Sequence, residues 1–196
     1  MFDLPCILFA GGKSSRMGQD KALLPFGEYS SLTQFQYSRL SKLFTHIFIS
    51  TKTSDKFDFA ANFILDPVDA DFAPTAGFVG VFEQIQSDRI FALSVDSPFI
   101  EKETISKLLE ADKPDFDAVI ARTPCGTHPM VGVYHRSLID KFSRMLKEGD
   151  HRLGKLLDMS NTHYVDFSNE KLFTNLNHPN EYEEAVSRYN NKNKSK

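Results

Sequence analysis

The sequence predicts a single α/β domain built on a mostly parallel β-sheet. Its 196 residues are about the length of one domain, and 41% of them are hydrophobic, which is sufficient for a sizeable core. Short apolar runs alternate along the chain with segments whose apolar residues recur at three- and four-residue spacing. Strands that alternate with helices in this way usually pair in parallel, with the helices as connections.

The expected elements follow in chain order. Strands are predicted for the short apolar or β-branched runs Cys6–Ala10, Ile47–Ser50, Phe63–Leu65, Ile90–Val95, Ala118–Ala121, Met130–Tyr134 and Tyr164–Phe167. Helices are predicted for the segments of helical spacing Ser31–Leu43, Val79–Ile85, Thr104–Leu109, Ser137–Leu146, Arg152–Leu157 and Glu181–Ser187. The predicted domain spans residues 1–189. Asn190–Lys196 contains only Asn, Lys and Ser, so it cannot bury apolar surface and is predicted to be a disordered tail.

The composition excludes several classes of protein. A formal net charge of −3 argues against a dedicated nucleic-acid binder, because such proteins usually carry a basic excess. No apolar run approaches the roughly 18 residues that a membrane-spanning helix needs, and the N-terminal segment lacks the basic start of a signal peptide. The two cysteines, Cys6 and Cys125, are too few for a disulfide framework. We therefore expect a reduced, cytoplasmic protein.

The segment after the first predicted strand has the character of a phosphate-binding loop. The strand runs directly into Gly11 and Gly12, and the cations Arg16 and Lys21 follow within ten residues. Glycines leave backbone N–H groups free to face a ligand, and Arg and Lys suit phosphate oxygens. Open α/β sheets bind ligands at this carboxyl end of their strands. The alternative interpretation is a glycine-rich turn with solvated charges.

Two better-known phosphate motifs do not fit this loop. Gly12-Lys13-Ser14 resembles the end of a P-loop, but that motif needs a glycine where the chain has Ile7. The dinucleotide fingerprint needs a residue between its first two glycines, whereas Gly11 and Gly12 are adjacent. The segment is therefore neither a P-loop nor a dinucleotide-binding loop.

Asp96 is the first candidate metal ligand. It follows the apolar strand Ile90–Val95, so it should project toward the same sheet edge as Gly11 and Gly12. A carboxylate that faces bound phosphates is unfavourable unless a cation lies between them, which implies Mg²⁺. The alternative interpretation is an N-cap for a helix that begins near Ile100.

Several motifs together resemble one family of nucleotidyltransferases. The run Phe9-Ala10-Gly11-Gly12-Lys13-Ser14-Ser15-Arg16-Met17-Gly18, followed by Asp20-Lys21, resembles the signature of enzymes that activate sugars and cofactors, and its Ala-Gly-Gly form is most similar to the molybdenum cofactor guanylyltransferases. Asp96-Ser97-Pro98-Phe99 and Asn175-Leu176-Asn177-His178-Pro179 are similar to later motifs of that family, and the order is the same from Leu4 to Tyr182. The resemblance implies a three-layer α/β/α, Rossmann-like domain of the nucleotidyltransferase type.

The resemblance also implies an activity and its participants. The enzyme would transfer GMP from GTP to molybdopterin or the molybdenum cofactor, with Mg²⁺ as cofactor and pyrophosphate as the second product. Proteins that insert the cofactor, and the molybdoenzymes that receive it, would be its protein partners. The attacking group is already an anionic phosphate, so alignment and charge neutralisation suffice without a general base.

Residue roles are implied in the same way. The catalytic residues would be Arg16, Lys21 and Asp96, with Asp96 as metal ligand. Nucleotide binding would involve Phe9, Ala10, Gly11, Gly12, Lys13, Lys21, Lys52, Asp66, Gly77, Gly80 and Asp96. Lys52 stands where the family carries an Asn near the base, and Asp69 and Asp71 compete with Asp66 as the second carboxylate of the site. The alternative interpretation of Gly77 and Gly80 is a tight strand-to-helix turn without contact to the nucleotide.

Asn175 and Asn177 are the candidate molybdopterin ligands. Two residues at this spacing on an extended segment point to the same side, and carboxamides can donate to and accept from pterin and phosphate edges. The alternative is an Asx-turn that caps the final helix.

Two other functions are compatible with these motifs. One is transfer by a relative with different substrates, such as a molybdopterin cytidylyltransferase or a sugar-phosphate nucleotidylyltransferase. The other is a non-catalytic module that binds nucleotide or carries the cofactor. Lys21 and Asp96 are both present, which favours an enzyme, and Ala10-Gly11-Gly12 favours GTP over CTP.

Overall fold

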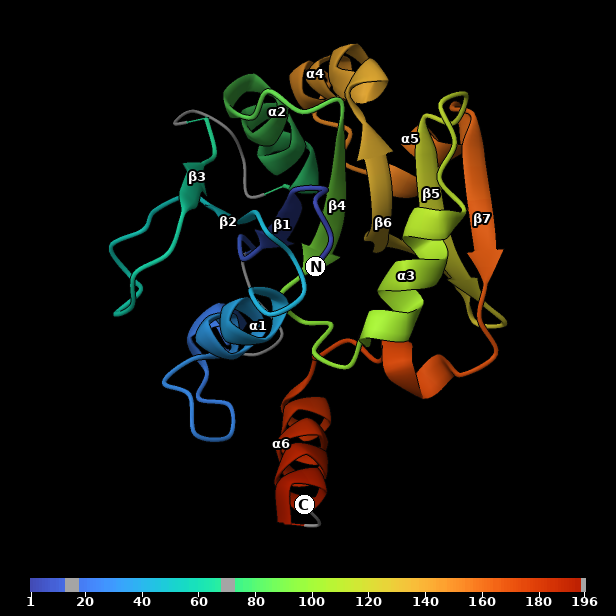
Figure 1. Cartoon of the computed structure of the whole chain (residues 1–196). Coiled ribbons are helices and arrows are strands. Elements are labelled where there is room, and N and C mark those ends of the chain that lie inside the picture. The colour runs from blue at the N-terminus through green and yellow to red at the C-terminus, as the bar shows by residue number, and fades with distance from the viewer. Residues whose placement is uncertain (13–17, 68–72, 195–196) are drawn as a thin grey trace.

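Seven strands form one mixed sheet in the computed structural model, which describes residues 1–12, 18–67 and 73–194 (Figure 1). The strands are β1 (Cys6–Phe9), β2 (Ile47–Thr51), β3 (Phe63–Leu65), β4 (Arg89–Ser94), β5 (Ala118–Thr123), β6 (Gly126–His135) and β7 (Thr162–Asp166). Their order across the sheet is β3-β2-β1-β4-β6-β5-β7. Only β6 runs antiparallel to its neighbours, β4 and β5, so the predicted mostly parallel sheet is confirmed.

All six predicted helices are present: α1 (Leu32–Leu40), α2 (Pro74–Gln84), α3 (Lys102–Glu110), α4 (Ile139–Lys147), α5 (Leu153–Asp158) and α6 (Pro179–Lys194). The 3₁₀ turns η1 (Lys21–Leu23), η2 (Arg136–Leu138) and η3 (Glu170–Phe173) were not predicted. Helix α2 begins at Pro74 rather than at Val79, because proline suits the first turn of a helix, where its missing N–H costs nothing.

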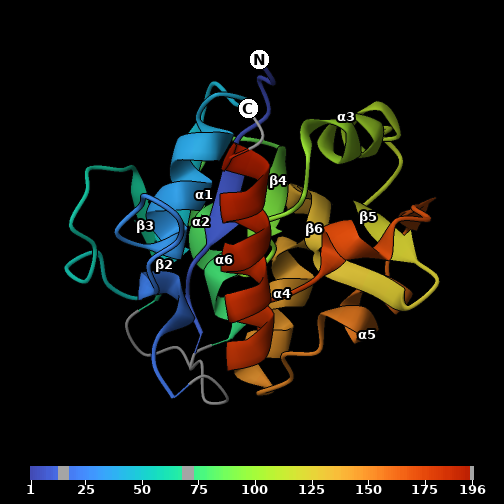
Figure 2. The ribbon, with the colours of Figure 1, turned by 90° about the horizontal axis from the view of Figure 1, so that it is seen from below.

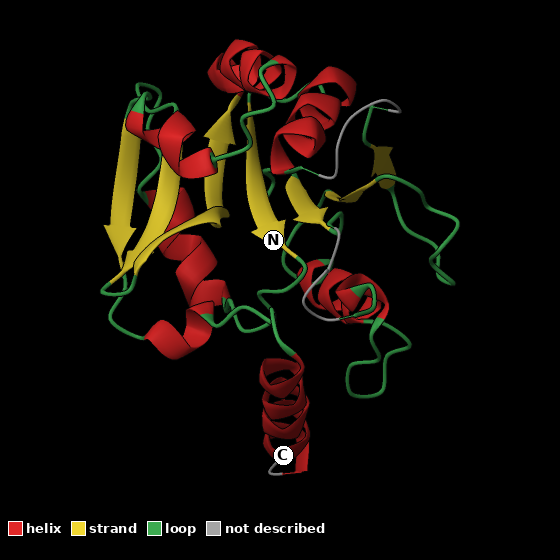
Figure 3. Ribbon diagram, turned by 180° about the vertical axis from the view of Figure 1, so that it is seen from behind, coloured by secondary structure: helices red, strands yellow, loops and turns green. Residues whose placement is uncertain are grey.

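The sheet separates two apolar layers, since successive side chains of a strand face opposite sides. Along β1, Cys6 and Leu8 join the layer that α1, α3 and α6 cover, whereas Ile7 and Phe9 join the layer under α2, α4 and α5. Figure 3 shows helices on both faces of the sheet, and Figure 2 shows α6 between α1 and α3. This is the predicted three-layer α/β/α arrangement.

Strand β6 begins at Gly126, four residues before the predicted start at Met130, and a tight turn at Pro124 and Cys125 joins it to β5 as an antiparallel hairpin. The first half of β6 is exposed or half-buried, so it lacks the apolar pattern that marked Met130–Tyr134.

Helix α6 extends to Lys194, beyond the predicted end at Ser187 and into the segment from Asn190 that was predicted to be disordered. Once a helix is nucleated by packed residues such as Ala185, each further residue adds a backbone hydrogen bond. The domain boundary at residue 189 stays a prediction. Across the described ranges, no helix has both the length and the apolar character to cross a bilayer.

The register of β1 sets the position of the candidate site. Phe9 pairs in parallel with Ser50 of β2 on one side and with Ser94 of β4 on the other. The three strands therefore end at the same level, and the residues that follow them emerge at one edge of the sheet. Gly11, Gly12 and Asp96 are among those residues.

The packing between α2 and α4 generates a stability prediction. Phe142 is fully buried and its ring stacks on that of Phe78, with centroids 4.4 Å apart. We expect Phe142→Ala to lower the free energy of unfolding by about 3–5 kcal/mol, because it leaves a cavity, and Phe142→Leu to cost less. Urea unfolding followed by circular dichroism measures both. Met159→Ala, at an exposed site, is the control, and equal midpoints for Phe142→Ala and the control would contradict the packing argument.

Candidate active site

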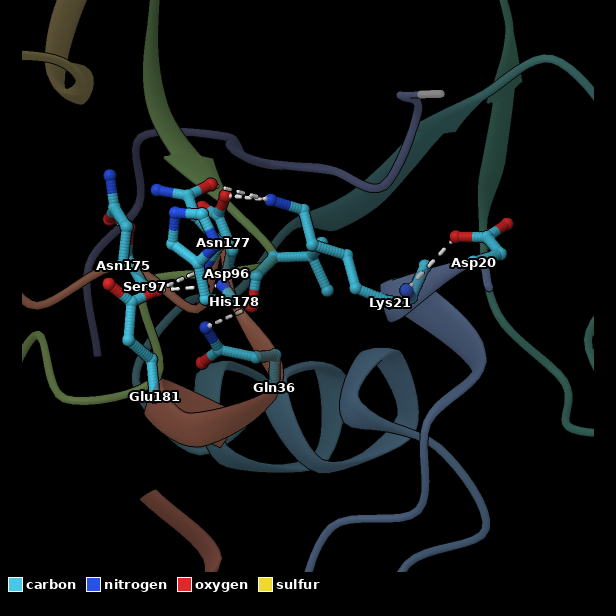
Figure 4. A network of polar contacts seen from close by, with 11 residues as sticks. Asp20, Lys21, Gln36, Asp96, Ser97, Asn175, Asn177, His178 and Glu181 are labelled. Carbon is cyan, nitrogen blue, oxygen red and sulfur yellow. Dashed lines mark hydrogen bonds and ion pairs between the residues drawn. The ribbon is translucent and has the colours of Figure 1, made fainter. Parts of the chain in front are cut away.

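A largely buried ion pair lies at the carboxyl edge of the sheet. The Nζ of Lys21 donates to Asp96 Oδ2, and it also donates to Asn177 Oδ1 at 3.2 Å (Figure 4). Lys21 belongs to η1, Asp96 follows β4, and Asn177 precedes α6. Three predicted site residues from distant parts of the chain thus meet at one ammonium group.

The backbone around Asp96 is held from three directions. Val95 N donates to Phe9 O at 3.0 Å, and Leu176 N donates to Asp96 O at 2.9 Å. The buried side chain of Gln36, on α1, donates to Val95 O at 3.2 Å. The carboxylate of Asp96 is therefore carried on a fixed backbone.

Asp96 does not cap a helix. The N-cap of α3 is Glu101, so the alternative interpretation of Asp96 as an N-cap is wrong. The loop from Ser97 to Ile100 intervenes between the end of β4 and the helix. This leaves the Asp96 carboxylate free to face the sheet edge.

One oxygen of Asp96 suits a cation. Asp96 is only 7% exposed, and its Oδ1 atom is buried without a hydrogen-bond partner among the described residues. A buried, unpaired carboxylate oxygen is costly, whereas Mg²⁺ is typically held by one or two carboxylates together with substrate phosphates. The described part of the chain holds no cluster of three His, Cys, Asp or Glu residues, so an ion here would need oxygens from a ligand or from water.

Asn175 and Asn177 both border this network. Asn175 Oδ1 accepts a hydrogen bond from Ser97 Oγ at 2.7 Å (Figure 4). The backbone N–H groups of Asn177 and His178 donate to Glu181 Oε2, at 2.7 and 2.8 Å. Glu181 thus takes the capping role at α6 that the Asx-turn alternative gave to the asparagines, and the Asn177 carboxamide accepts from Lys21 instead.

A pocket of about 160 Å³ adjoins the glycines. Its lining residues are Phe9, Gly11, Gly12, Ser50, Asp66, Ala73, Pro74, Gly77, Ser94 and Met130. Five of the predicted nucleotide-binding residues, Phe9, Gly11, Gly12, Asp66 and Gly77, are therefore brought together. A larger pocket, of about 420 Å³, lies between α1, α6 and the segment 98–101, and none of the predicted site residues lines it.

Two glycines of this pocket are required by its geometry. Gly12 has a φ of +154°, which strains any other residue. A Cβ atom on Gly77 would lie 2.9 Å from Phe9 Cε1 and from Ser50 Oγ, so glycine lets α2 approach the end of β1. Gly77 and Gly80 lie inside α2 and not in a strand-to-helix turn. Gly80 faces Leu65 O, and it does not line the pocket.

Asp66 is the described carboxylate of this pocket. Its Oδ1 accepts a hydrogen bond from Ser50 Oγ at 3.0 Å. Burial raises the pKa of Asp66 above its ordinary value, while the Ser50 hydroxyl and the charges of Lys52 and Lys56 offset part of the rise. Asp66 can accept hydrogen bonds from N–H groups of a ligand.

Ser50 is a site residue that sequence reasoning missed. It lines the pocket, whereas Lys52, two positions later, does not, although its charge lowers the pKa of Asp66. The available signal was the position of Ser50 as the polar last residue of the predicted strand Ile47–Ser50. Ala10, also predicted, is buried, and its N–H donates to Ser50 O at 2.9 Å.

Four predicted residues lie outside the described part of the chain. They are Lys13 and Arg16 in the glycine-rich segment, and Asp69 and Asp71 before α2. Their roles stay predictions.

Comparisons with known proteins agree with this geometry. Residues 6–165 match the family described as the MobA-like NTP transferase domain. The chain is 36% identical over 186 residues to the molybdenum cofactor guanylyltransferase of Campylobacter jejuni subsp. doylei, over 94% of this chain and 96% of that protein. It is 35% identical over 189 residues to the protein of the same name from Helicobacter pylori strain G27, over 94% of this chain and 92% of that protein.

Solved structures share the fold. The molybdopterin-guanine dinucleotide biosynthesis protein A of Archaeoglobus fulgidus has a TM-score of 0.82 at 18% identity, over 96% of this chain and all of that one (100%). A protein of Aquifex aeolicus has a TM-score of 0.74 at 30% identity, over 89% of this chain and 93% of that chain. The glycine-lined pocket, the Lys21–Asp96 pair and the extent of these matches lead to one conclusion: the chain belongs to the family of MobA-like NTP transferases.

Proposed function

We propose that this protein transfers GMP from GTP to the terminal phosphate of molybdopterin, which forms the guanine dinucleotide and releases pyrophosphate. The observation that carries the proposal is the contact of Lys21 with both Asp96 and Asn177, beside a pocket built from Gly11 and Gly12. The relatives named molybdenum cofactor guanylyltransferase, which match over nearly the whole chain, support this choice of substrates.

The pocket beside Asp66 suits the guanine base. Guanine presents N1–H and N2–H₂ donors on one edge, and the buried Asp66 carboxylate is an acceptor for such donors. Cytosine lacks this pair of donors, so the Asp66 oxygen that Ser50 does not contact would stay unpaired, at a cost of about 1–3 kcal/mol. Asp66 would therefore contribute to the selection of GTP.

Lys21 and Asp96 would act on the phosphates. Lys21 would donate to triphosphate oxygens and neutralise charge that develops on the leaving pyrophosphate. Asp96 would hold Mg²⁺ through its unpaired Oδ1, and the ion would supply charge neutralisation at the phosphates. The attacking phosphate needs no general base, so this chain would contribute alignment above all.

The acceptor would approach from the side of Asn175 and Asn177. Because Asn177 shares Lys21 with Asp96, the two substrates would meet at the Lys21 ammonium group. The product would pass to cofactor-inserting proteins and to molybdoenzymes. The reaction would take place in the cytoplasm, and neither nucleic acid nor a membrane would be a partner.

Removal of the Asp96 charge should abolish transfer. We expect Asp96→Asn to lower kcat by about 100-fold or more, because a metal carboxylate supplies several kcal/mol of transition-state stabilisation, with the fold unchanged. Pyrophosphate release from GTP and molybdopterin measures the rate, and a thermal melt checks the fold. Asp140→Asn, at an exposed site on α4, is the matched control. Near wild-type turnover of Asp96→Asn at ordinary Mg²⁺ would show that the metal assignment is wrong.

Nucleotide choice tests the proposed function directly. We expect kcat/KM for GTP to exceed that for CTP and ATP by roughly 10- to 100-fold, since the pocket matches the guanine edge. Asp66→Asn should reduce this preference chiefly by impairing GTP. Turnover is measured with the three nucleotides side by side and molybdopterin as acceptor. Equal or faster turnover with CTP would point to a cytidylyltransferase, and no turnover despite GTP binding would point to a non-catalytic module.

The two asparagines should differ in their effects. Asn175 contacts Ser97 and not Lys21, so Asn175→Ala should raise the KM for molybdopterin and leave the KM for GTP unchanged. Asn177→Ala should raise both, because Asn177 accepts from Lys21. Titration of each variant with each substrate distinguishes these patterns. Weakened GTP binding in Asn175→Ala would reject this placement of the acceptor.

A further inference from the structure

Lys56 joins the two ends of the glycine-rich segment. Its Nζ donates to Asp20 Oδ2 at 2.7 Å and to Ala10 O at 3.4 Å. Ala10 directly precedes Gly11, and Asp20 directly precedes Lys21. A side chain from the loop after β2 therefore contacts both the entry to the segment and its exit.

Asp20 links Lys56 to the turn that carries Lys21. One carboxylate oxygen of Asp20 accepts from Ala22 N at 3.0 Å and so caps η1, while the other accepts from Lys56. Figure 4 shows the side chains of Asp20 and Lys21 extending to opposite sides of this turn, with Lys21 directed at Asp96. A 3₁₀ turn of three residues has little stability of its own, so its orientation depends on such contacts.

The Lys56–Asp20 pair does little for global stability. Lys56 and Asp20 keep 21% and 31% of their side-chain surface exposed, and ion pairs open to solvent contribute little to the free energy of folding. An interaction of this kind can still restrict local geometry, because it reduces the conformational freedom of the two residues that it holds, Ala10 and Asp20. Its effect is then expected in the site and not in the melting temperature.

We propose that Lys56 is a positioning residue for nucleotide binding and transfer, which holds Ala10 and Asp20 and thereby orients Lys21. The inference rests on the proposed function for its reaction, but the structural contacts concern the nucleotide half of the site alone. Lys56 belongs to none of the motifs by which the sequence resembles its family.

Four variants test this role. Lys56→Met keeps an unbranched aliphatic side chain but removes Nζ, which makes both hydrogen bonds and lies 5.1 Å from the centre of the Phe57 ring. We expect it to lower kcat/KM for GTP about tenfold, with the KM for molybdopterin and the melting temperature unchanged. Lys56→Arg keeps a donor for Asp20 and should restore most of the loss. Asp20→Asn retains an acceptor for Ala22 N but not the charge, and should resemble Lys56→Met. The double variant should lose no more than either single variant, because the two residues act through one contact.

Lys141→Met is the matched control. Lys141 Nζ likewise donates to a backbone oxygen, that of Met159, at 3.0 Å and lies 3.6 Å from a carboxylate, that of Asp117, on the α4 side of the molecule. We expect its kinetics to equal those of the wild type. Equal kinetics for Lys56→Met and this control, or fully additive losses in the Lys56→Met/Asp20→Asn variant, would overturn the proposal.

Calorimetric titration with GTP and Mg²⁺, without molybdopterin, separates this inference from the proposed function. If the wild type binds GTP but transfers no GMP, the proposed function fails, and weaker GTP binding by Lys56→Met still supports the role of Lys56. If the wild type transfers GMP and Lys56→Met binds GTP as tightly as the wild type, the proposed function stands and the role of Lys56 is rejected.

Discussion

The parallel register of β1 between β2 and β4 is the constraint on which the site depends. Because Phe9 pairs with both Ser50 and Ser94, the three central strands end at one level. The glycines after β1 and Ser50 then line one pocket, and Asp96, two residues beyond Ser94, emerges at the same edge of the sheet. A shift of one residue in either pairing would turn these side chains to the other face of the sheet.

The Lys21–Asp96 pair connects this edge of the sheet with the C-terminal part of the chain. A buried carboxylate costs free energy unless it is paired, and Lys21 provides the opposite charge for one of its oxygens. The backbone oxygen of Asp96 accepts from Leu176 N, which places Asn175 and Asn177 beside the same carboxylate. The last segment of the chain thereby completes a site that begins at the first strand.

The core and the site share residues, which explains the tight packing around the pocket. Phe9 packs on Phe78 in the layer beneath α2, with ring centroids 4.7 Å apart, and it also lines the pocket. Gly77 allows α2 to lie against Phe9 and Ser50 without a collision. The part of the pocket wall that Phe9 forms therefore belongs to the apolar core.

Apolar periodicity by itself determined the seven strands, the six helices and the single domain, because each pattern is local to a few residues. The rule that parallel strands end at one edge then placed Gly11, Gly12 and Asp96 together. Only the tertiary structure decided that β5 and β6 form a hairpin, that Ser50 contacts Asp66, and that Lys21 reaches Asn177. The contacts of Lys56 could not be predicted from the sequence either, since its partners Ala10 and Asp20 lie 46 and 36 positions away. Such contacts depend on how loops dock against one another in space, and no spacing along the chain encodes that docking.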